Sequence, residues 1–296
     1  MSQFLSPIRN KLLATFVRQI AGFGVLSSPA STHHDKVLQI PSRDTERTIK
    51  VHVYTCASPN TPAPVLINFH GSGFVIPMHG TDDEFALRIA KDTQYTVLDV
   101  QYRLAPEHPF PAGVQDAEDV VRYVLSQPNE YDETRIAVSG FSAGGNFALG
   151  LSGHSFPNNV FRHVVAFYPP INLAQNPGTK IAPDTSGRPI PVWLAGIFDD
   201  CYCPAPVRRD QPLVSPGFIK ADQFPDSVVV ITCAQDGLAV EAEELVARLR
   251  EVNGKRVVHE RMEECGHAWD KECKPGTVQE ERKQRAYDLV VEVLAK

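Results

Sequence analysis

The 296-residue sequence predicts a single α/β domain built around a mostly parallel sheet with helices on both faces. Apolar, β-branched runs of strand length recur along the chain. Several of them are almost continuous rather than alternating, which is typical of strands that are covered on both faces. Segments with helical periodicity lie between these runs. Such alternation favours parallel strands joined by crossover helices.

Seven strands and five helices follow from these patterns. The strands are expected at residues 48–54, 64–70, 95–102, 135–140, 163–168, 227–233 and 256–262. The helices are expected at residues 82–93, 112–127, 144–153, 240–254 and 278–296.

Two segments interrupt the alternation, one from residue 1 to about 40 and the other from about 170 to 215. The second is rich in proline, aspartate and aromatic residues. Because long connections in compact domains usually have a function, we expect the two segments to form a cap on the single domain of residues 1–296. The cap should lie over the carboxyl edge of the sheet, where open α/β sheets bind ligands.

The composition excludes some classes of partner. The chain is 43% hydrophobic and 22% charged with a net charge of −6, so it offers no basic surface for nucleic acid or an anionic membrane. No apolar run reaches the roughly 18 residues that a membrane helix needs. The apolar N-terminal stretch is interrupted by Arg9, Lys11 and Arg18, unlike a signal peptide. We therefore expect a soluble, cytoplasmic protein.

The six cysteines are too sparse for a disulfide framework and are expected to be free thiols. Cys201 and Cys203 flank a single residue, and no second pair of ligands stands at zinc-finger spacing. The sequence therefore predicts no metal site and no organic cofactor.

A G-x-S-x-G motif at residues 140–144 is the strongest chemical signal, with Ser142 at its centre. It follows an expected strand and precedes an expected helix, which is the context of a nucleophile elbow. Glycines on either side permit the sharp turn that raises the Ser142 hydroxyl and places the Ala143 N–H beside a reacting carbonyl. An ordinary glycine-rich turn is the structural alternative.

A serine nucleophile needs a base, which a third group orients. In this kind of fold the acid and then the histidine follow the serine along the chain. His267 follows an expected strand in a loop. By contrast, His163 and His259 lie in strands and His154 comes too soon after the elbow, so His267 is the predicted base.

Asp236 is the predicted acid because it comes at the end of the strand at 227–233. Its alternative role is to cap the helix that follows. Glu241, Glu243 and Glu244 are expected on the solvated face of that helix, and Asp270 remains a reserve candidate.

The stretch His70-Gly71-Ser72-Gly73 follows the strand at 64–70. A loop of this type supplies backbone N–H groups that stabilise the oxyanion of an acyl-transfer intermediate. The predicted donors are Ser72, Gly73 and Ala143, with Gly71 as a further candidate.

These motifs resemble the hormone-sensitive lipase family of α/β-hydrolases. The resemblance covers residues 48–296 and includes YRLAPEHPFPAG at 102–113, a loop expected to buttress the active site. The chain departs from the family pattern at three places. Ser72 replaces a glycine, Phe141 replaces an acidic residue, and the sequence around Asp236 differs.

The resemblance implies a serine carboxylesterase that hydrolyses small-molecule esters with short to medium acyl chains through an acyl-enzyme, with an acylated natural product as one candidate substrate. Two alternatives are a lyase, dehydratase or cyclising enzyme, and a non-catalytic binding module. The final helix and the edge strands could support a homodimer, although the sequence itself does not predict one. Aromatic residues expected to line the substrate pocket are Phe74, Phe141, Trp193, Phe198 and Tyr202.

Overall fold

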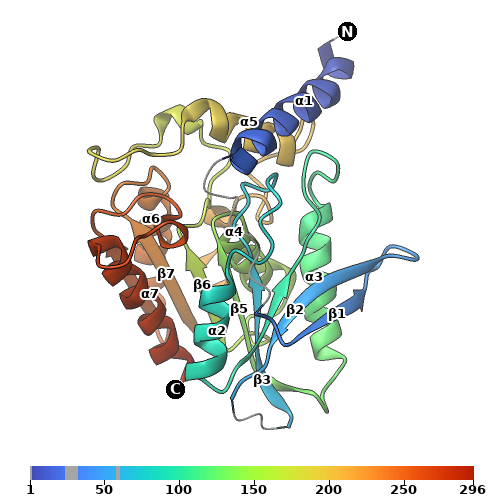
Figure 1. The fold of residues 1–296 in the computed structure, drawn as a ribbon, viewed down its shortest axis with the longest axis vertical. Helices are drawn as coiled ribbons and strands as arrows, with labels where there is room; N and C mark the ends of the chain where they lie inside the picture. Colours follow the sequence, from blue (N-terminus) through green and yellow to red (C-terminus); the bar gives the residue numbers. More distant parts are fainter. Residues whose placement is uncertain (1, 24–32, 58–60) are drawn as a thin grey trace.

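The computed structural model describes residues 2–23, 33–57 and 61–296. Within these residues, eight strands form one sheet in the order β1-β2-β4-β3-β5-β6-β7-β8 (Figure 1). Strands β1 and β2 pair antiparallel, β2 pairs antiparallel with β4, and the remaining pairs are parallel. The strands are β1 (Lys36–Pro41), β2 (Thr48–Tyr54), β3 (Ala63–Phe69), β4 (Thr96–Val100), β5 (Tyr131–Phe141), β6 (His163–Phe167), β7 (Ser227–Cys233) and β8 (Arg256–Met262).

Strand β1 corrects the predicted extent of the cap. Residues 36–40 were expected in the first cap segment, but they pair with β2, with Leu38 opposite Val51. The strand lies at the edge of the sheet, and Ile40 is its only buried residue. A mostly exposed edge strand has little apolar signal, which explains why the pattern missed it.

Helices cover both faces of the sheet, as predicted. The helices are α1 (Ser2–Phe23), α2 (Asp83–Asp92), α3 (Ala112–Leu125), α4 (Ala143–Gly150), α5 (Val192–Tyr202), α6 (Ala239–Arg250) and α7 (Val278–Leu294). A short π-helical turn, Leu151–Ser155, continues α4.

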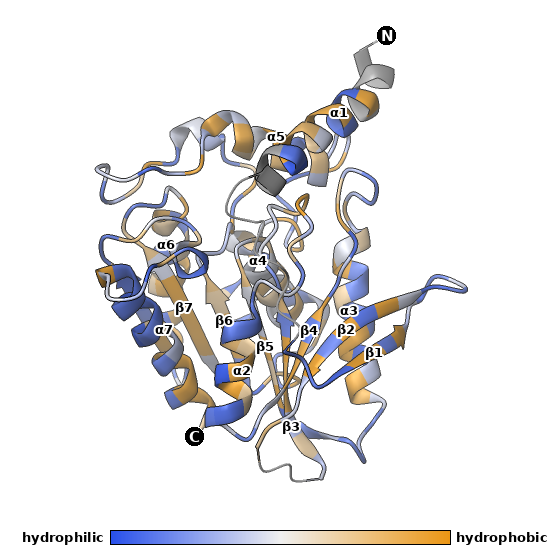
Figure 2. Ribbon diagram, in the orientation of Figure 1, coloured by the Kyte–Doolittle hydropathy of each residue, from blue (hydrophilic) through white to orange (hydrophobic). Residues whose placement is uncertain are grey.

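Strand β3 shows how the two faces are divided. Val65, Ile67 and Phe69 point into one apolar core with α3, α4 and α6, and Leu66 points into a second core with α2 and α7. All seven residues of β3 are buried, which agrees with the continuous apolar run in the sequence. Figure 2 shows the hydrophobic strands at the centre and the hydrophilic outer face of α7.

Two helices outside the sheet layers, α1 and α5, pack against each other above the carboxyl ends of the strands (Figure 1). The guanidinium of Arg18 in α1 donates to the carbonyl oxygens of Val75 and Ala105, both at 2.9 Å. It also forms an ion pair with Glu107, with a nitrogen–oxygen distance of 2.7 Å. These contacts attach α1 to the loops that follow β3 and β4.

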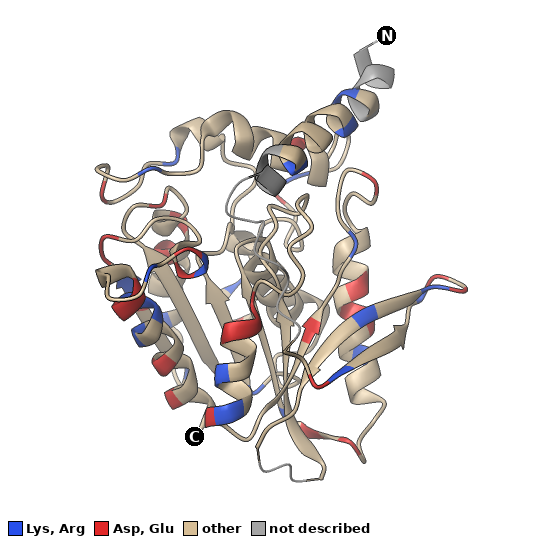
Figure 3. Cartoon of the chain, viewed as in Figure 1, with Lys and Arg blue, Asp and Glu red and all other residues tan. Residues whose placement is uncertain are grey.

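Both α2 and α7 carry acidic residues in their first turn and basic residues further along the helix (Figure 3). None of the helices in the described part of the chain combines the length and apolar character needed to cross a bilayer.

Candidate active site

Ser142 lies at the sharp turn between β5 and α4. Its φ of +50° and ψ of −116° are unusual for a residue with a side chain, which is typical of a nucleophile elbow. The surrounding backbone leaves no room for a side chain at Gly140 or Gly144, the two glycines of the motif. A Cβ on Gly144 would overlap the carbonyl oxygen of Phe69, and one on Gly140 would overlap the carbonyl group of Gly144. The turn therefore requires both glycines of the motif.

The three predicted triad residues lie in one hydrogen-bonded row. The Ser142 hydroxyl oxygen is 2.9 Å from Nε2 of His267, and Nδ1 of His267 is 2.7 Å from Oδ2 of Asp236. The second carboxylate oxygen of Asp236 accepts from the Leu238 N–H at 3.0 Å. Asp236 is only 1% exposed, so its carboxylate is held by these two donors. The cap of α6 is Leu238 rather than Asp236, the alternative considered above.

The competing histidines are engaged elsewhere. Nδ1 of His163 lies 2.8 Å from the Ser227 hydroxyl, and Nε2 of His259 lies 3.0 Å from the Thr232 hydroxyl. His154 is exposed.

The competing acids also have partners of their own. Asp270 accepts from Tyr168 at 2.6 Å and from Tyr287 at 3.0 Å. The solvated position expected for Glu241 is wrong, because this carboxylate is buried and pairs with Lys180 at 2.7 Å. The helical pattern alone could not locate that lysine.

The loop after β3 brings backbone N–H groups up to Ser142. Gly71 lies against the serine, since a Cβ there would be 3.6 Å from the Ser142 Cβ. Among the described residues, no protein acceptor is bonded to the N–H groups of Ser72 and Gly73. As the first residue of α4, Ala143 has no carbonyl one turn earlier to receive its N–H. These three donors are therefore free to bind a substrate oxygen.

The side chain of Ser72 stabilises this loop from behind. Its oxygen accepts from the Phe74 N–H at 2.8 Å and lies 2.7 Å from the Tyr102 hydroxyl. Tyr102 in turn donates to the His70 carbonyl at 2.6 Å, so Ser72 must be the donor to Tyr102. Burial raises the pKa of Tyr102 and keeps this hydroxyl protonated. Ser72 therefore stabilises the loop at residues 70–74, called the donor loop below, through its hydroxyl.

His70 begins the same loop and is fully enclosed. Burial lowers the pKa of His70 to about 3, so the imidazole is neutral, and Nδ1 donates to the Gly71 carbonyl at 3.0 Å. The ring stacks on Tyr102 with a centroid distance of 4.3 Å. Through Tyr102, the YRLAPEHPFPAG loop braces the N–H donors, as its resemblance to the family motif implies.

A cavity of about 270 Å³ lies beside Ser142 and His267. Of the five aromatic residues predicted to line it, Phe74 and Phe198 do so. Phe198 lies closest to the donor loop, because a Cβ on Gly73 would be 2.6 Å from its ring.

The other three aromatic predictions are wrong. Phe141 is fully buried below the elbow, where it stacks on Phe167 with a centroid distance of 4.4 Å. Tyr202 is buried behind Phe74 and stacks on it at 3.8 Å. Trp193, in α5, is 56% exposed and does not belong to the cavity wall. The sequence located these three aromatic residues near the site. It did not show in which direction each side chain points.

Sequence reasoning missed most of the cavity wall. Apolar residues form much of it, namely Ile76, Met78, Pro170, Leu173, Pro177, Ile190, Pro191, Leu194, Ala195, Leu238 and Ala268. Several belong to α5 and the segments around it, where no motif marks them. The expectation of an apolar pocket agrees with this wall.

Buried polar groups in the wall were also missed. Tyr168 packs edge-to-face on His267 at a centroid distance of 4.8 Å. Lys271 forms ion pairs with Asp82 at 2.7 Å and with Asp270 at 2.9 Å. Its ammonium lies 3.6 Å from the centre of the Phe141 ring, which explains an aromatic residue at that position. Asp270, the reserve candidate for the triad acid, therefore stabilises the loop around His267 through its bonds to Tyr168 and Lys271.

Asp199 in α5 also lines the cavity. Burial raises the pKa of its carboxyl group to about 6, and the attraction of Arg209, 3.9 Å away, offsets this rise only in part. At neutral pH this group brings a partly compensated negative charge to the cap side of the cavity.

A mostly parallel sheet with a serine elbow after β5, followed along the chain by an acid and a histidine, defines an α/β-hydrolase. The chain belongs to this family, because the family model described as alpha/beta hydrolase fold matches residues 66–271. This finding confirms the resemblance found in the motifs.

Known esterases are similar to the chain. Esterase LipI of Mycobacterium tuberculosis is 35% identical over 158 residues, which is 49% of each chain. Ethyl acetate hydrolase of Pseudomonas putida is 27% identical over 66% of this chain and 64% of its own. The aligned regions thus span 49% and 64% of these two relatives. A solved esterase from Pyrobaculum calidifontis superposes with a TM-score of 0.80 at 27% identity, covering 98% of this chain and 97% of its own.

Proposed function

We propose that the protein is a serine carboxylesterase that acts on small esters with short acyl chains. The observation that carries this proposal is the row of hydrogen bonds from Ser142 through His267 to Asp236, beside three free N–H donors. The similar esterases support the same activity.

In the first half of the reaction, the Ser142 oxygen attacks the ester carbonyl carbon while Nε2 of His267 takes its proton. Asp236 accepts the Nδ1–H of the same ring and stabilises the resulting imidazolium. The carbonyl oxygen becomes an oxyanion held by the N–H groups of Ser72, Gly73 and Ala143, each worth about 3 to 4 kcal/mol. His267 then protonates the departing alcohol, and an acyl-serine remains.

In the second half, a water molecule gives its proton to Nε2 of His267 and attacks the acyl carbon. The same donors hold the second oxyanion. Collapse of this intermediate releases the carboxylic acid and returns the proton to Ser142. Each step uses only side chains and backbone groups present at the site.

The cavity supports a preference for small esters. Its volume of about 270 Å³ lies just below the range of roughly 300–1,000 Å³ typical of sites for drug-sized ligands. The apolar wall suits an uncharged acyl or alcohol group. The family resemblance also predicts that the natural substrate is an acylated natural product, and this stays a prediction.

We place the protein in the cytoplasm because of its cysteines. All six are free in the structure, and five are buried. Such thiols persist most readily in a reducing compartment. Fractionation of the source cells tests this placement, and a signal confined to a secreted fraction would contradict it.

Turnover of p-nitrophenyl acetate, butyrate, octanoate and palmitate by wild type and Ser142→Ala tests the activity. We expect fast hydrolysis of the two short esters and its loss in the variant. Unchanged turnover in Ser142→Ala would contradict the proposal. Product analysis distinguishes a lyase or cyclising enzyme, since only hydrolysis consumes water and releases an acid.

A further inference from the structure

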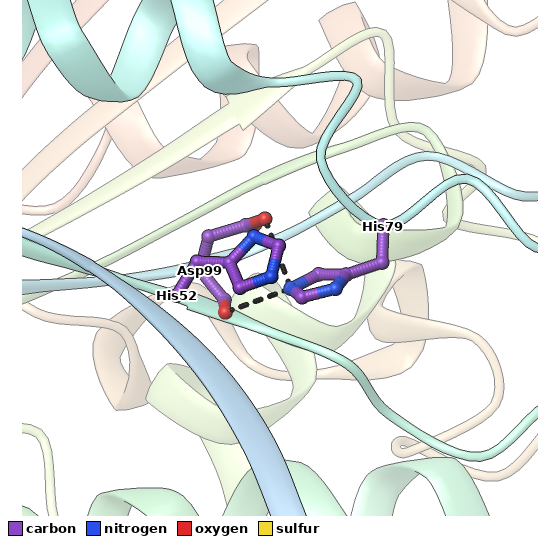
Figure 4. Close-up of side chains that lie close together, drawn as sticks. All are labelled: His52, His79 and Asp99. Carbon is purple, nitrogen blue, oxygen red and sulfur yellow. Dashed lines mark hydrogen bonds and ion pairs between the residues drawn. The ribbon is translucent and has the colours of Figure 1, made fainter. Parts of the chain in front are cut away.

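A cluster of histidines lies outside the cavity, on the face of the sheet that α2 covers. His52 in β2 stands directly opposite Asp99 in β4, and the loop before α2 places His79 over both (Figure 4). Nε2 of His79 lies 3.2 Å from Oδ2 of Asp99 and 3.1 Å from its backbone carbonyl. One ligand atom from each residue falls within 4.8 Å of the others.

His52 is buried without a hydrogen-bond partner. Its exposed fraction is 5%, and in the described residues neither ring nitrogen has a donor or acceptor in reach. Its ring stacks between His34 and His79, both with centroid distances of 4.0 Å. Burying two ring nitrogens without hydrogen bonds is unfavourable, because both lose their contacts with water. A metal ion bonded to one of the two nitrogens would relieve part of that cost.

Asp99 is a buried carboxyl group that shares the Asn68 amide with a second buried carboxyl group, Asp82. The Asp99 side chain is fully buried, and within the described ranges no lysine or arginine forms an ion pair with it. The amide of Asn68 donates to both Asp99 and Asp82, at 2.9 Å each. Lys271 already serves Asp82 and Asp270. A divalent ion would therefore be the cationic partner that this carboxyl group lacks among the described residues.

We propose that His52, His79 and Asp99 bind a divalent transition-metal ion of the zinc type. Two imidazoles and one carboxylate are a common ligand set for zinc, whereas calcium and magnesium prefer oxygen alone. A tetrahedral zinc holds its ligand atoms roughly 3.3 Å apart. Nε2 of His79 and Oδ2 of Asp99 already lie 3.2 Å apart, so most of the movement needed falls to His52. His52 can rotate without breaking a hydrogen bond in the described structure.

The position of the site indicates a structural role. Met78 and Thr81, on either side of His79, line the cavity, and His52 and Asp99 belong to the sheet. The metal would join the loop at 78–82 to the sheet and so hold one wall of the cavity. The Asn68 amide, which donates to Asp99, would orient that ligand as an outer partner.

Titration of Zn²⁺ into the EDTA-stripped full chain, followed by calorimetry and native mass spectrometry, tests the proposal. We expect one ion per chain in wild type and a loss of affinity of more than about tenfold in His79→Ala and His52→Phe. The phenylalanine keeps a buried aromatic ring at position 52, so this variant should fold. His259→Ala is the matched control, since that half-buried imidazole also lies near a carboxylate, Glu243, at 3.8 Å.

Co²⁺ identifies the ligands by its absorption spectrum. We expect tetrahedral bands without a thiolate charge-transfer band in wild type and in His259→Ala. The absence of binding in wild type, equal binding in His79→Ala, or a thiolate band would each overturn the proposal. The readouts are metal affinity and spectrum, so they do not depend on whether the protein hydrolyses esters.

Discussion

Asp236 uses its two carboxylate oxygens for two different donors, and this arrangement makes a single substitution informative. In Asp236→Asn the remaining oxygen can still accept from Leu238, which turns the new amide NH₂ toward Nδ1 of His267. The imidazole must then carry its proton on Nε2 and cannot accept one from Ser142.

We expect Asp236→Asn to lower kcat by on the order of 10³ to 10⁴ with little change in stability. Steady-state kinetics and thermal unfolding of the variant measure both effects. Asp210→Asn, at an exposed carboxylate paired with Arg208, is the control and should leave kcat unchanged. A loss of less than tenfold in Asp236→Asn would show that another group orients the histidine.

At the residue scale, the triad was predictable because each member stands at a strand end in a fixed order. The direction in which the aromatic side chains point was not predictable. Phe141 and Tyr202 both lie near the elbow in sequence or space, yet they fill the cores beneath it. A strand that is buried on both faces contains no alternation from which the orientation of its last residue could be read.

Helix α5 forms one wall of the cavity, and two of its three aromatic residues, Phe198 and Trp193, differ in their surroundings. Phe198 faces the donor loop, and Trp193 is exposed. We expect Phe198→Ala to enlarge the cavity and to raise the ratio of kcat/KM for octanoate over acetate by roughly tenfold. Trp193→Ala should leave the ratio unchanged. A larger effect from Trp193 would mean that α5 presents its other face to the substrate.

The elbow between β5 and α4 depends on the close approach of three backbone segments. Gly144→Ala places a methyl group against the Phe69 carbonyl and should destabilise the fold by more than about 3 kcal/mol. Gly196→Ala, in the open middle of α5, should instead stabilise it by up to about 1 kcal/mol. Urea unfolding of both variants checks this contrast, and equal stabilities would contradict the described turn.

At the element scale, the sequence predicted the strands β2 to β8 and the helices α2, α3, α4, α6 and α7. Strand β1 escaped because it lies at an edge with one buried residue, and α5 escaped because proline and glycine surround its apolar residues. Both elements gain their stability from tertiary partners. The apolar periodicity of the sequence is weak in elements that depend on contacts with the rest of the fold.

The stability of the whole molecule should depend on the ionisation of Asp199. Because burial raises the pKa of this group to about 6, the folded state binds its proton more tightly than the unfolded state. Its contribution to stability is full below the unfolded pKa of about 3.9 and is lost as the pH rises through 6. Asp199→Asn removes this dependence.

We expect the stability of Asp199→Asn relative to wild type to rise by about 2 kcal/mol between pH 4.5 and pH 8. Urea unfolding at several pH values measures this difference. Asp210→Asn is the exposed control and should show no such rise. A constant difference for Asp199→Asn across this range would mean that the carboxylate is compensated in the folded protein.

The proposed metal ligands illustrate what the whole fold adds to the sequence. His52, His79 and Asp99 come from two strands and a loop, and their spacing matches no ligand motif. Antiparallel pairing of β2 with β4 brings two of them opposite each other, and the turn before α2 supplies the third. Such a site is visible only after the strand order is known.

The most direct test of the account is to trap the acyl-enzyme. Rapid acid quenching of the protein with p-nitrophenyl acetate, followed by peptide mass spectrometry, locates the acetyl group. We predict a burst of p-nitrophenol with acetyl on Ser142 in wild type, and neither in Ser142→Ala. Release of p-nitrophenol with acetyl on another residue, or a burst that survives in Ser142→Ala, would contradict the assignment of Ser142 as the nucleophile.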